Sequence, residues 1–357
     1  MNTGRRYRLP TEGTPVKCKS SSMNTEYCFP SLNDSCIKTT RTTITRTALY
    51  ICVISCMLTT ICGNLVVVIS IFHFKQLHCP TNVLVCSLAV VDFLVGFLIM
   101  PYSMIKSIES CWYFGGEFCK VHTSFDLMFC TSSVFHLCFI AIDRYYAVCD
   151  PLRYYTKITF STVMCFVAIS WIIPALTSFG IILSQVNLVE TADYIASINC
   201  TGLCVILFDK IWTVFNCILL FIAPSAVMIC IYVKIYFVAK RHAEAFMSHN
   251  GRAGNNKLNI SSKNERKAAK TLSIVMGIFI ICWLPTVVFC VSDTFLNYSV
   301  PSDLLDASVW LAYFNSGFNP VIYGFFYPWF RKSLHVIVSG KVFSPNSSTI
   351  RLFLENV

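Results

Sequence analysis

The feature that most constrains this chain is a series of seven apolar segments, each long enough to cross a membrane as a helix. They cover residues 47–73, 82–105, 119–146, 162–184, 210–238, 268–292 and 306–327, and about 20 apolar residues suffice for one crossing. Charged residues make up only 13% of the chain, against roughly 25% in a soluble domain. The segments predict an all-α membrane protein, a bundle of seven helices, and argue against a nucleic-acid-binding protein despite the net charge of +10.

Basic residues predict how the bundle is oriented. The connection from Lys234 to Lys270 carries nine lysine and arginine residues, and further basic residues follow the last segment, whereas the opposite connections are mostly acidic. Because basic loops stay in the cytosol, we expect the N-terminus outside the cell. Lys38, Arg41 and Arg46, which precede the first segment, favour the opposite orientation, but the summed bias outweighs them. The expected parts are an extracellular tail (1–46), ordered only around its cysteines, a membrane domain (47–328), and a cytoplasmic part (329–357).

The third segment carries polar groups on one face. At 100° per residue, Cys119, Asp126, Ser133 and Arg144 fall on one narrow stripe of a helix. The first and last of them lie roughly 37 Å apart along the axis, about one membrane thickness. An unpaired ionisable group inside a membrane costs at least ~2.5–3.5 kcal/mol, so we expect Asp126 to be functional.

Short motifs follow one another in a fixed order along the seven segments. They are Gly63-Asn64, Leu88-Ala89-Val90-Val91-Asp92, Asp143-Arg144-Tyr145, Trp171, Pro224, Cys282-Trp283-Leu284-Pro285 and Asn319-Pro320-Val321-Ile322-Tyr323. Each motif is weak alone, but in this order they resemble the rhodopsin-like G-protein-coupled receptors over about residues 47–343. This resemblance implies a plasma-membrane receptor with a G protein as its partner.

Further motifs resemble the trace amine-associated receptors, nearest their primary-amine subgroup. They are Asn315-Ser316 before Asn319-Pro320, Tyr327-Pro328-Trp329-Phe330-Arg331-Lys332, Cys200-Thr201-Gly202-Leu203-Cys204, Glu109-Ser110-Cys111-Trp112-Tyr113-Phe114-Gly115, and Ser347-Ser348-Thr349. The resemblance implies that Asp126 pairs with a ligand's ammonium group and that Tyr313 donates a hydrogen bond to this acid. A protonated primary amine suits a desolvated carboxylate. The expected pocket walls are Phe125, Leu127, Cys130, Thr131, Trp283, Thr286, Val287, Trp310 and Tyr313.

The fifth segment bounds the ligand chemistry. Catecholamine receptors place serines there, whereas the matching positions in this chain hold Asn216, Cys217 and Leu220. No second acid occurs there, which disfavours diamines. We therefore expect a small arylalkylamine such as phenylethylamine.

The resemblance also implies two disulfides, Cys119–Cys204 and Cys36–Cys200. For the second pair, Cys28 and Cys18 remain alternatives to Cys36, and Cys111 is expected to stay unpaired. Asn33, Asn199 and Asn297 begin sequons on the outer side and are candidates for glycosylation.

On the cytoplasmic side, the resemblance implies that Arg144 pairs with Asp143 and with Glu265 of the sixth segment. The remaining residues expected to act in activation are Tyr145, Tyr232, Asn319, Pro320 and Tyr323, with Trp283 and Phe279 linking them to the ligand. No cofactor is required. Asp92, Ser133, Asn315, Ser316 and Asn319 resemble the family's sodium pocket, and a water-filled polar network is an equal alternative. Residues 329–343 predict an amphipathic eighth helix on the membrane lipid, and no cysteine follows Cys290 to carry a palmitoyl anchor.

The leading hypothesis is an amine receptor for smell, coupled to a stimulatory or olfactory-type G protein that raises cAMP. The alternative is a classical aminergic receptor of the serotonin type. A photosensor needs a lysine in the last segment, but residues 306–327 contain none. The odd number of segments disfavours a transporter. No catalytic or metal-binding pattern indicates an enzyme.

Overall fold

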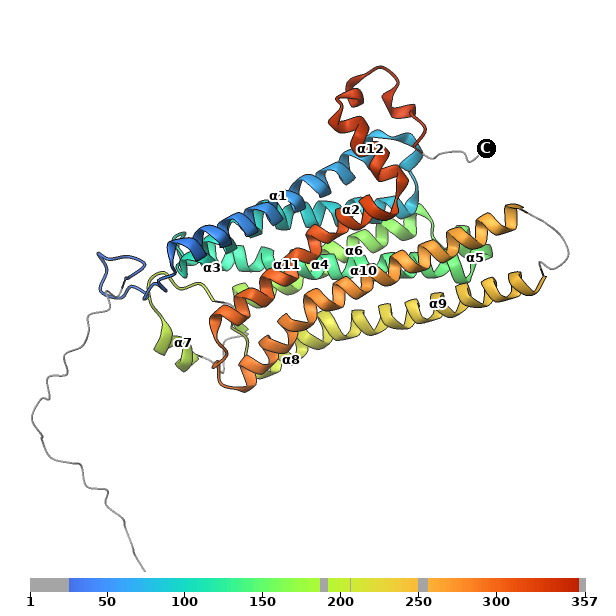
Figure 1. Ribbon diagram of the computed structural model, residues 1–357. Helices are drawn as coiled ribbons and strands as arrows, with labels where there is room; N and C mark the ends of the chain where they lie inside the picture. Colours follow the sequence, from blue (N-terminus) through green and yellow to red (C-terminus); the bar gives the residue numbers. More distant parts are fainter. Residues whose placement is uncertain (1–25, 187–191, 206, 250–255, 353–357) are drawn as a thin grey trace, which may run out of the picture.

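The computed structural model describes residues 26–186, 192–205, 207–249 and 256–352; the side chains of 192, 193, 220, 239, 242–249 and 256–273 are outside this description. Seven long helical stretches lie side by side (Figure 1). In chain order they are α1 (Thr43–His73), α2 and α3 (Pro80–Leu94 and Met100–Glu109, joined by the π-helical Val95–Ile99), α4 (Gly116–Cys149), α6 (Phe160–Ser184), α8 and α9 (Lys210–Asn216 and Ala223–His249, joined by the π-helical η4, Cys217–Ile222), α10 (Asn256–Phe295) and α11 (Ser302–Phe326).

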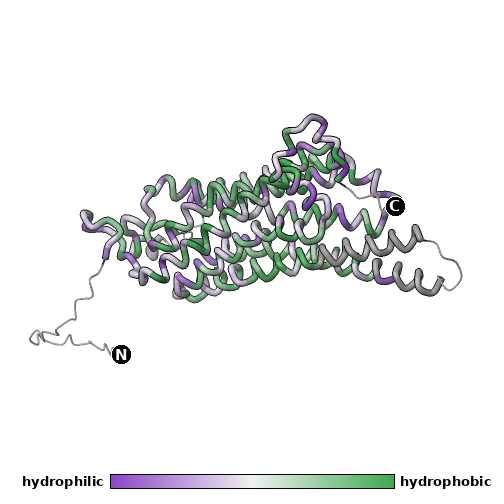
Figure 2. Tube along the Cα trace, turned by 45° about the horizontal axis from the view of Figure 1, so that its top comes forward, coloured by the Kyte–Doolittle hydropathy of each residue, from purple (hydrophilic) through white to green (hydrophobic). Residues whose placement is uncertain are grey.

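The bundle has two distinct ends. The amino-tail end carries residues 26–42 and the short helix α7 (Ala192–Ile198), and the carboxyl-tail end carries α5 (Pro151–Lys157) and α12 (Pro328–Val338) (Figure 1). Hydrophobic residues occupy most of the length of the long helices (Figure 2). This pattern is the one expected of a bundle whose outer surface faces lipid.

Each predicted segment is helical. Among the described residues, six of the seven stretches are long enough and apolar enough to cross a membrane. The seventh, α11, carries polar residues that include Asp303, Asp306 and Asn319, and it packs between α1 and α10. Two helices extend beyond their apolar segments, because α9 continues to His249 and α10 begins at Asn256. These extra turns are polar, so hydropathy alone did not include them.

Local sequence explains where several helices begin. The hydroxyl groups of Thr42 and Thr159 accept hydrogen bonds from backbone N–H groups in the first turns of α1 and α6, and Asp209 caps α8 in the same way. Proline occupies the first position of α5 and α12, where no N–H is needed. The Thr42 cap places the start of α1 four residues before the predicted one.

The α1–α11 contact is unusually close. A Cβ atom added at Gly63 would lie 2.6 Å from the Cβ atom of Pro320, and one added at Gly317 would lie 2.9 Å from the Thr60 hydroxyl. The Asn64 amide donates to the Ser316 carbonyl at 3.1 Å. Glycine at position 63 is therefore a packing requirement of this helix pair.

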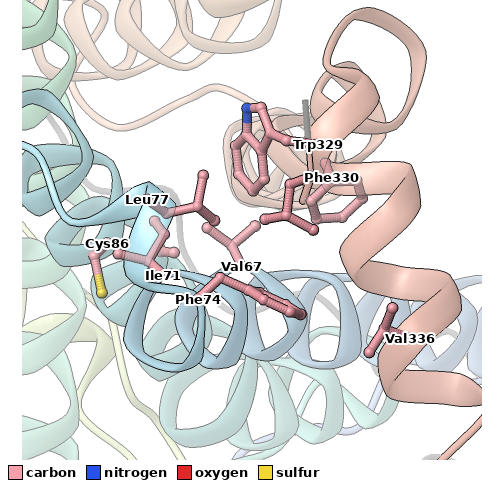
Figure 3. Packing of buried hydrophobic residues seen from close by; sticks show 10 residues of the cluster. Val67, Ile71, Phe74, Leu77, Cys86, Trp329, Phe330 and Val336 are labelled. Atoms are coloured by element: carbon pink, nitrogen blue, oxygen red, sulfur yellow. The ribbon is translucent and has the colours of Figure 1, made fainter. Parts of the chain in front are cut away.

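Helix α12 and the residues after it pack against the carboxyl-tail end of α1. Phe74 and Leu77 meet Trp329, Phe330 and other side chains of α12 in one apolar cluster (Figure 3). Leu352 belongs to the same cluster and is only 1% exposed. The predicted helix over 329–343 is too long, because Gly340 adopts a left-handed φ of 70° and the α-helix has ended at Val338.

Candidate functional site

Asp126 lies in α4 and faces α11 across the centre of the bundle. The Tyr313 hydroxyl donates a hydrogen bond of 2.6 Å to one carboxylate oxygen, and the Cys130 thiol lies 3.5 Å from the other. None of the ion pairs among the described side chains involves Asp126. The carboxylate therefore has neutral donors but no bonded counter-charge.

The predicted wall residues Trp283, Thr286 and Trp310 lie on α10 and α11. The Trp310 ring packs edge-to-face on Tyr313 at 5.3 Å, and its N–H donates to the Ser107 hydroxyl at 3.1 Å. The Thr286 hydroxyl donates to the Ser308 carbonyl at 2.7 Å, which ties α10 to α11. Within the described part of the chain, the buried indole N–H of Trp283 has no hydrogen-bond partner.

Other predicted wall residues have different surroundings. Phe125 packs edge-to-face against Phe179 of α6 at 5.0 Å, and the Asn216 amide donates to the Trp212 carbonyl of its own helix at 2.8 Å. Leu127 and Val287 are partly buried, Thr131 is buried, and the side chain of Leu220 lies outside the described residues. The structure thus brings Tyr313 and Cys130 directly to Asp126, and it does not bring Asn216 there.

Two neighbours of the acid were not anticipated. The Ser103 hydroxyl lies 3.4 Å from the Tyr313 hydroxyl. His122, one helical turn before Asp126 in α4, lies with its Nε2 atom 3.3 Å from the Ile99 carbonyl oxygen. The spacing of four residues between His122 and Asp126 was a usable signal, because such residues share a helix face.

The amino-tail end is held by three disulfides. Cys119–Cys204 and Cys36–Cys200 are present as the resemblance implied. The expectation for Cys111 is wrong, because it is bonded to Cys28, so Cys28 is not the partner of Cys200. Cys18 lies outside the described residues. Sequence spacing did not reveal this bond, since the two cysteines stand 83 positions apart.

Ion pairs add to these disulfides around Glu109, which is buried. Its carboxylate is 2.8 Å from Lys38, 3.1 Å from Arg46, and accepts a 2.8 Å hydrogen bond from Tyr50. The hydrogen bond to Glu109 raises the pKa of Lys38, so this lysine is charged at neutral pH. Residues 26–42, which hold Cys28 and Cys36, are therefore tied to the bundle by ion pairs as well as by disulfides.

A second polar centre surrounds Asp92 in α2. Its carboxylate accepts hydrogen bonds from Ser316 at 2.7 Å, Asn319 at 2.7 Å and Ser133 at 3.4 Å. Asn315 is buried, but among the described side chains it has no hydrogen bond to this acid. Four of the five residues predicted for this centre therefore meet.

A third polar centre lies at the carboxyl-tail end of α4. Arg144 forms an ion pair with Asp143, and its Nε atom donates to that carboxylate at 2.7 Å. Thr81 and Tyr154 complete the centre: the Thr81 hydroxyl lies 3.0 Å from Asp143, 2.9 Å from Arg144 and 2.9 Å from Tyr154. Burial raises the pKa of Tyr154, so its hydroxyl remains a donor. The side chain of Glu265, the other predicted partner of Arg144, lies outside the described residues.

The remaining predicted activation residues lie on α4, α9 and α11. Tyr232 packs in two apolar clusters with residues of α4 and α10, and Tyr323 lies edge-to-face to Phe330 of α12 at 6.3 Å. Lys234 lies 5.8 Å from the centroid of the Tyr145 ring. Pro320 stands within α11, one residue after Asn319.

Comparison with known proteins assigns the chain to a family. Residues 63–323 match the family described as 7 transmembrane receptor (rhodopsin family). The chain is similar to trace amine-associated receptor 4 of Rattus norvegicus, with 50% identity over 93% of this chain and 96% of that protein. It is also similar to trace amine-associated receptor 1 of Homo sapiens, with 47% identity over 92% and 98%, and to trace amine-associated receptor 3 of Mus musculus, with 51% identity over 90% and 94%. The predicted seven-helix fold is thereby confirmed. The members of this family are multi-pass plasma-membrane receptors, not enzymes, and they take an amine ligand and a G protein partner. The chain belongs to the trace amine-associated receptors.

Proposed function

We propose that the receptor senses small primary arylalkylamines and that Asp126 forms an ion pair with their ammonium group. The observation that carries this proposal is the Asp126 carboxylate, which among the described side chains has no counter-charge and is bonded to the neutral groups of Tyr313 and Cys130. A buried charge needs a partner to offset its desolvation, and a protonated amine supplies one with three donors.

The groups beyond the acid support an uncatecholated ring as the rest of the ligand. Trp310 and Trp283 offer aromatic surface. Asn216, one of the positions that would hold a serine in a catecholamine receptor, uses its amide within its own helix. Ring hydroxyls would therefore lack a partner there, and an unpaired buried polar group is costly.

We further propose that the amino-tail end faces outward and that the receptor raises cAMP through a stimulatory or olfactory-type G protein, in a smell-sensing cell. Three disulfides gather at the amino-tail end, and such bonds persist in oxidising surroundings. The sequon residues Asn33, Asn199 and Asn297 are exposed at the same end, which suits glycosylation. The basic connection between α9 and α10 belongs to the other end, as expected for the cytosol.

For the Asp92 centre, the donor set fits a sodium ion. Asp92 would provide the charge, and Ser133 and Ser316 would turn their hydroxyl oxygens toward the ion; all are hard ligands. Asn64 bonds through its amide N–H to the Ser316 carbonyl. Its buried Oδ1 atom has no hydrogen-bond partner among the described residues, so a further acceptor is available near this centre. The ion would supply a positive charge that stabilises the resting packing of α2, α4 and α11.

The experiment that tests the ligand proposal is an amine panel that includes phenylethylamine, serotonin and a diamine. Responses are read as cAMP and, separately, as G-protein activation, in cells that express the receptor, Asp126→Ala or the isosteric Asp126→Asn at equal surface density. Removing one partner of a buried ion pair costs about 3–5 kcal/mol. Both variants should therefore lose potency for phenylethylamine by more than about a hundredfold.

Three outcomes separate the parts of the proposal. Unchanged potency of Asp126→Asn at normal surface density would refute the ion pair. A stronger response to serotonin than to phenylethylamine would favour the classical aminergic alternative. G-protein activation without cAMP would leave the ligand proposal standing and reject the stimulatory coupling.

A further inference from the structure

Two cysteines face the same contact between the fifth and sixth membrane spans. The hydroxyl oxygens of Thr213 in α8 and Thr294 in α10 lie 3.0 Å apart, so these two helices touch there. The helices run in opposite directions. The position four residues after Thr213 and the position four residues before Thr294 therefore both lie one helical turn deeper in the bundle. Those positions hold Cys217 and Cys290.

Backbone contacts keep each cysteine in register with its threonine. The Cys217 N–H donates to the Thr213 carbonyl at the start of η4, and the Thr294 hydroxyl donates to the Cys290 carbonyl at 3.0 Å. Residues four apart share a helix face, so each cysteine lies one turn from its threonine on the same side of its helix. Cys217 is partly buried there, and Cys290 is exposed. Both are free.

The surroundings limit what such a pair of thiols can bind. Among the described residues there is no group of three or more His, Cys, Asp or Glu side chains suited to a metal, whereas protein-built zinc sites use three or four ligands. Asp293, the nearest acid along α10, accepts a hydrogen bond from the Val300 N–H at 2.9 Å. Two thiolates without further ligands match a soft monovalent cation, since thiolates select ions such as Cu(I).

We propose that Cys217 and Cys290 form a two-thiolate site for a soft monovalent cation, copper(I), bridging η4 and α10 on the amino-tail side of Trp283. On binding, each thiol releases a proton and forms one sulfur–metal bond, with no change in oxidation state. The bound ion joins the fifth and sixth spans beside the amine site. The proposal does not depend on which amine the receptor senses.

The test uses the purified full-length receptor and silver(I), which binds thiolates as copper(I) does and needs no reductant. Thiols protected by silver from a maleimide reagent are identified by mass spectrometry of the digested protein. We expect Cys217 and Cys290 to become protected together, at a lower silver concentration than Cys230 of α9, which is exposed as Cys290 is. Dibromobimane, which fluoresces when it joins two nearby thiols, should cross-link the pair.

Single substitutions make the test quantitative. Cys217→Ser or Cys290→Ser should raise the silver concentration that half-protects the remaining thiol by at least about 100-fold, beyond the 10–100-fold that loss of an outer-shell partner costs. The matched control, Cys230→Ser, should leave half-protection of the pair unchanged. The site is refuted if the two thiols are protected no better than Cys230, or if one stays protected after the other is replaced. A Cys217–Cys290 disulfide in the non-reduced digest would also overturn it.

Discussion

Replacing Thr81 by valine should raise signalling in the absence of ligand. Its hydroxyl bonds Asp143 at 3.0 Å, Arg144 at 2.9 Å and Tyr154 at 2.9 Å, so one small side chain joins α2, α4 and α5 around the Arg144–Asp143 ion pair. Valine has the same shape but no hydroxyl. The substitution removes this shared partner and leaves the ion pair otherwise in place.

The size of the effect follows from the charged partners. A hydrogen bond to a charged group contributes about 1.5–3 kcal/mol. These bonds are made while Arg144 is paired with Asp143. Losing one of them therefore raises the equilibrium constant for the unpaired state over the paired state by about ten- to a hundredfold. For a receptor that is active about 1% of the time at rest, the lower figure gives about 10%. Basal signalling should therefore rise about tenfold or more.

The assay is basal G-protein activation, normalised to receptor density at the cell surface. The matched control is Thr81→Ser, which keeps the hydroxyl and should signal like the unaltered receptor. Equal basal signalling of the valine and serine variants, both at normal surface density, would refute the view that Thr81 stabilises the resting ion pair.

Two further predictions concern packing. Gly63→Ala places a Cβ atom 2.6 Å from Pro320 and should destabilise the purified receptor by about 1–3 kcal/mol, which lowers its melting temperature. The control Gly277→Ala, which has open space around its new Cβ atom, should leave the melting temperature unchanged. Equal melting temperatures of the two variants would contradict the close contact. Leu352→Ala removes a side chain only 1% exposed and should weaken docking of residues 343–352 by about 2–5 kcal/mol. Backbone hydrogen exchange in residues 343–352 should then become faster. The control Val338→Ala, which alters a side chain that is 77% exposed, should leave this exchange unchanged. Unchanged exchange in Leu352→Ala would show that the segment does not depend on Leu352.

The amino-acid sequence predicted the features that rest on local pattern or on a charge inside a membrane. Seven apolar segments are enough to place the long helices, because each must satisfy its own backbone hydrogen bonds. Asp126 stands out from the sequence alone, because an acid in a membrane span needs a reason. Its contact with Tyr313 followed from resemblance, since 187 positions separate the two residues.

Contacts between distant residues with no local pattern could not be predicted. The Cys28–Cys111 bond competes with many pairings of 20 cysteines. The ion pairs of Glu109 join the tail to α3, and charge alone does not say which of Lys38, Arg41 or Arg46 reaches it. Docking of Leu352 depends on a turn after α12 that hydropathy does not signal.

The polar groups on α4 differ in one respect that assigns their roles. Arg144 has a charged partner within the protein, because Asp143 occupies the preceding position of the same helix. Asp126 has neutral donors alone, of which the strongest comes from α11. Three and six residues after Tyr313, the same helix supplies Ser316 and Asn319 to Asp92. On the proposed ion pair, an amine at Asp126 would therefore alter a hydrogen bond of the helix whose next two turns hold the Asp92 centre. A ligand shifts an equilibrium only through contacts that differ between two states, and the proposed ion pair makes the Asp126–Tyr313 bond one such contact.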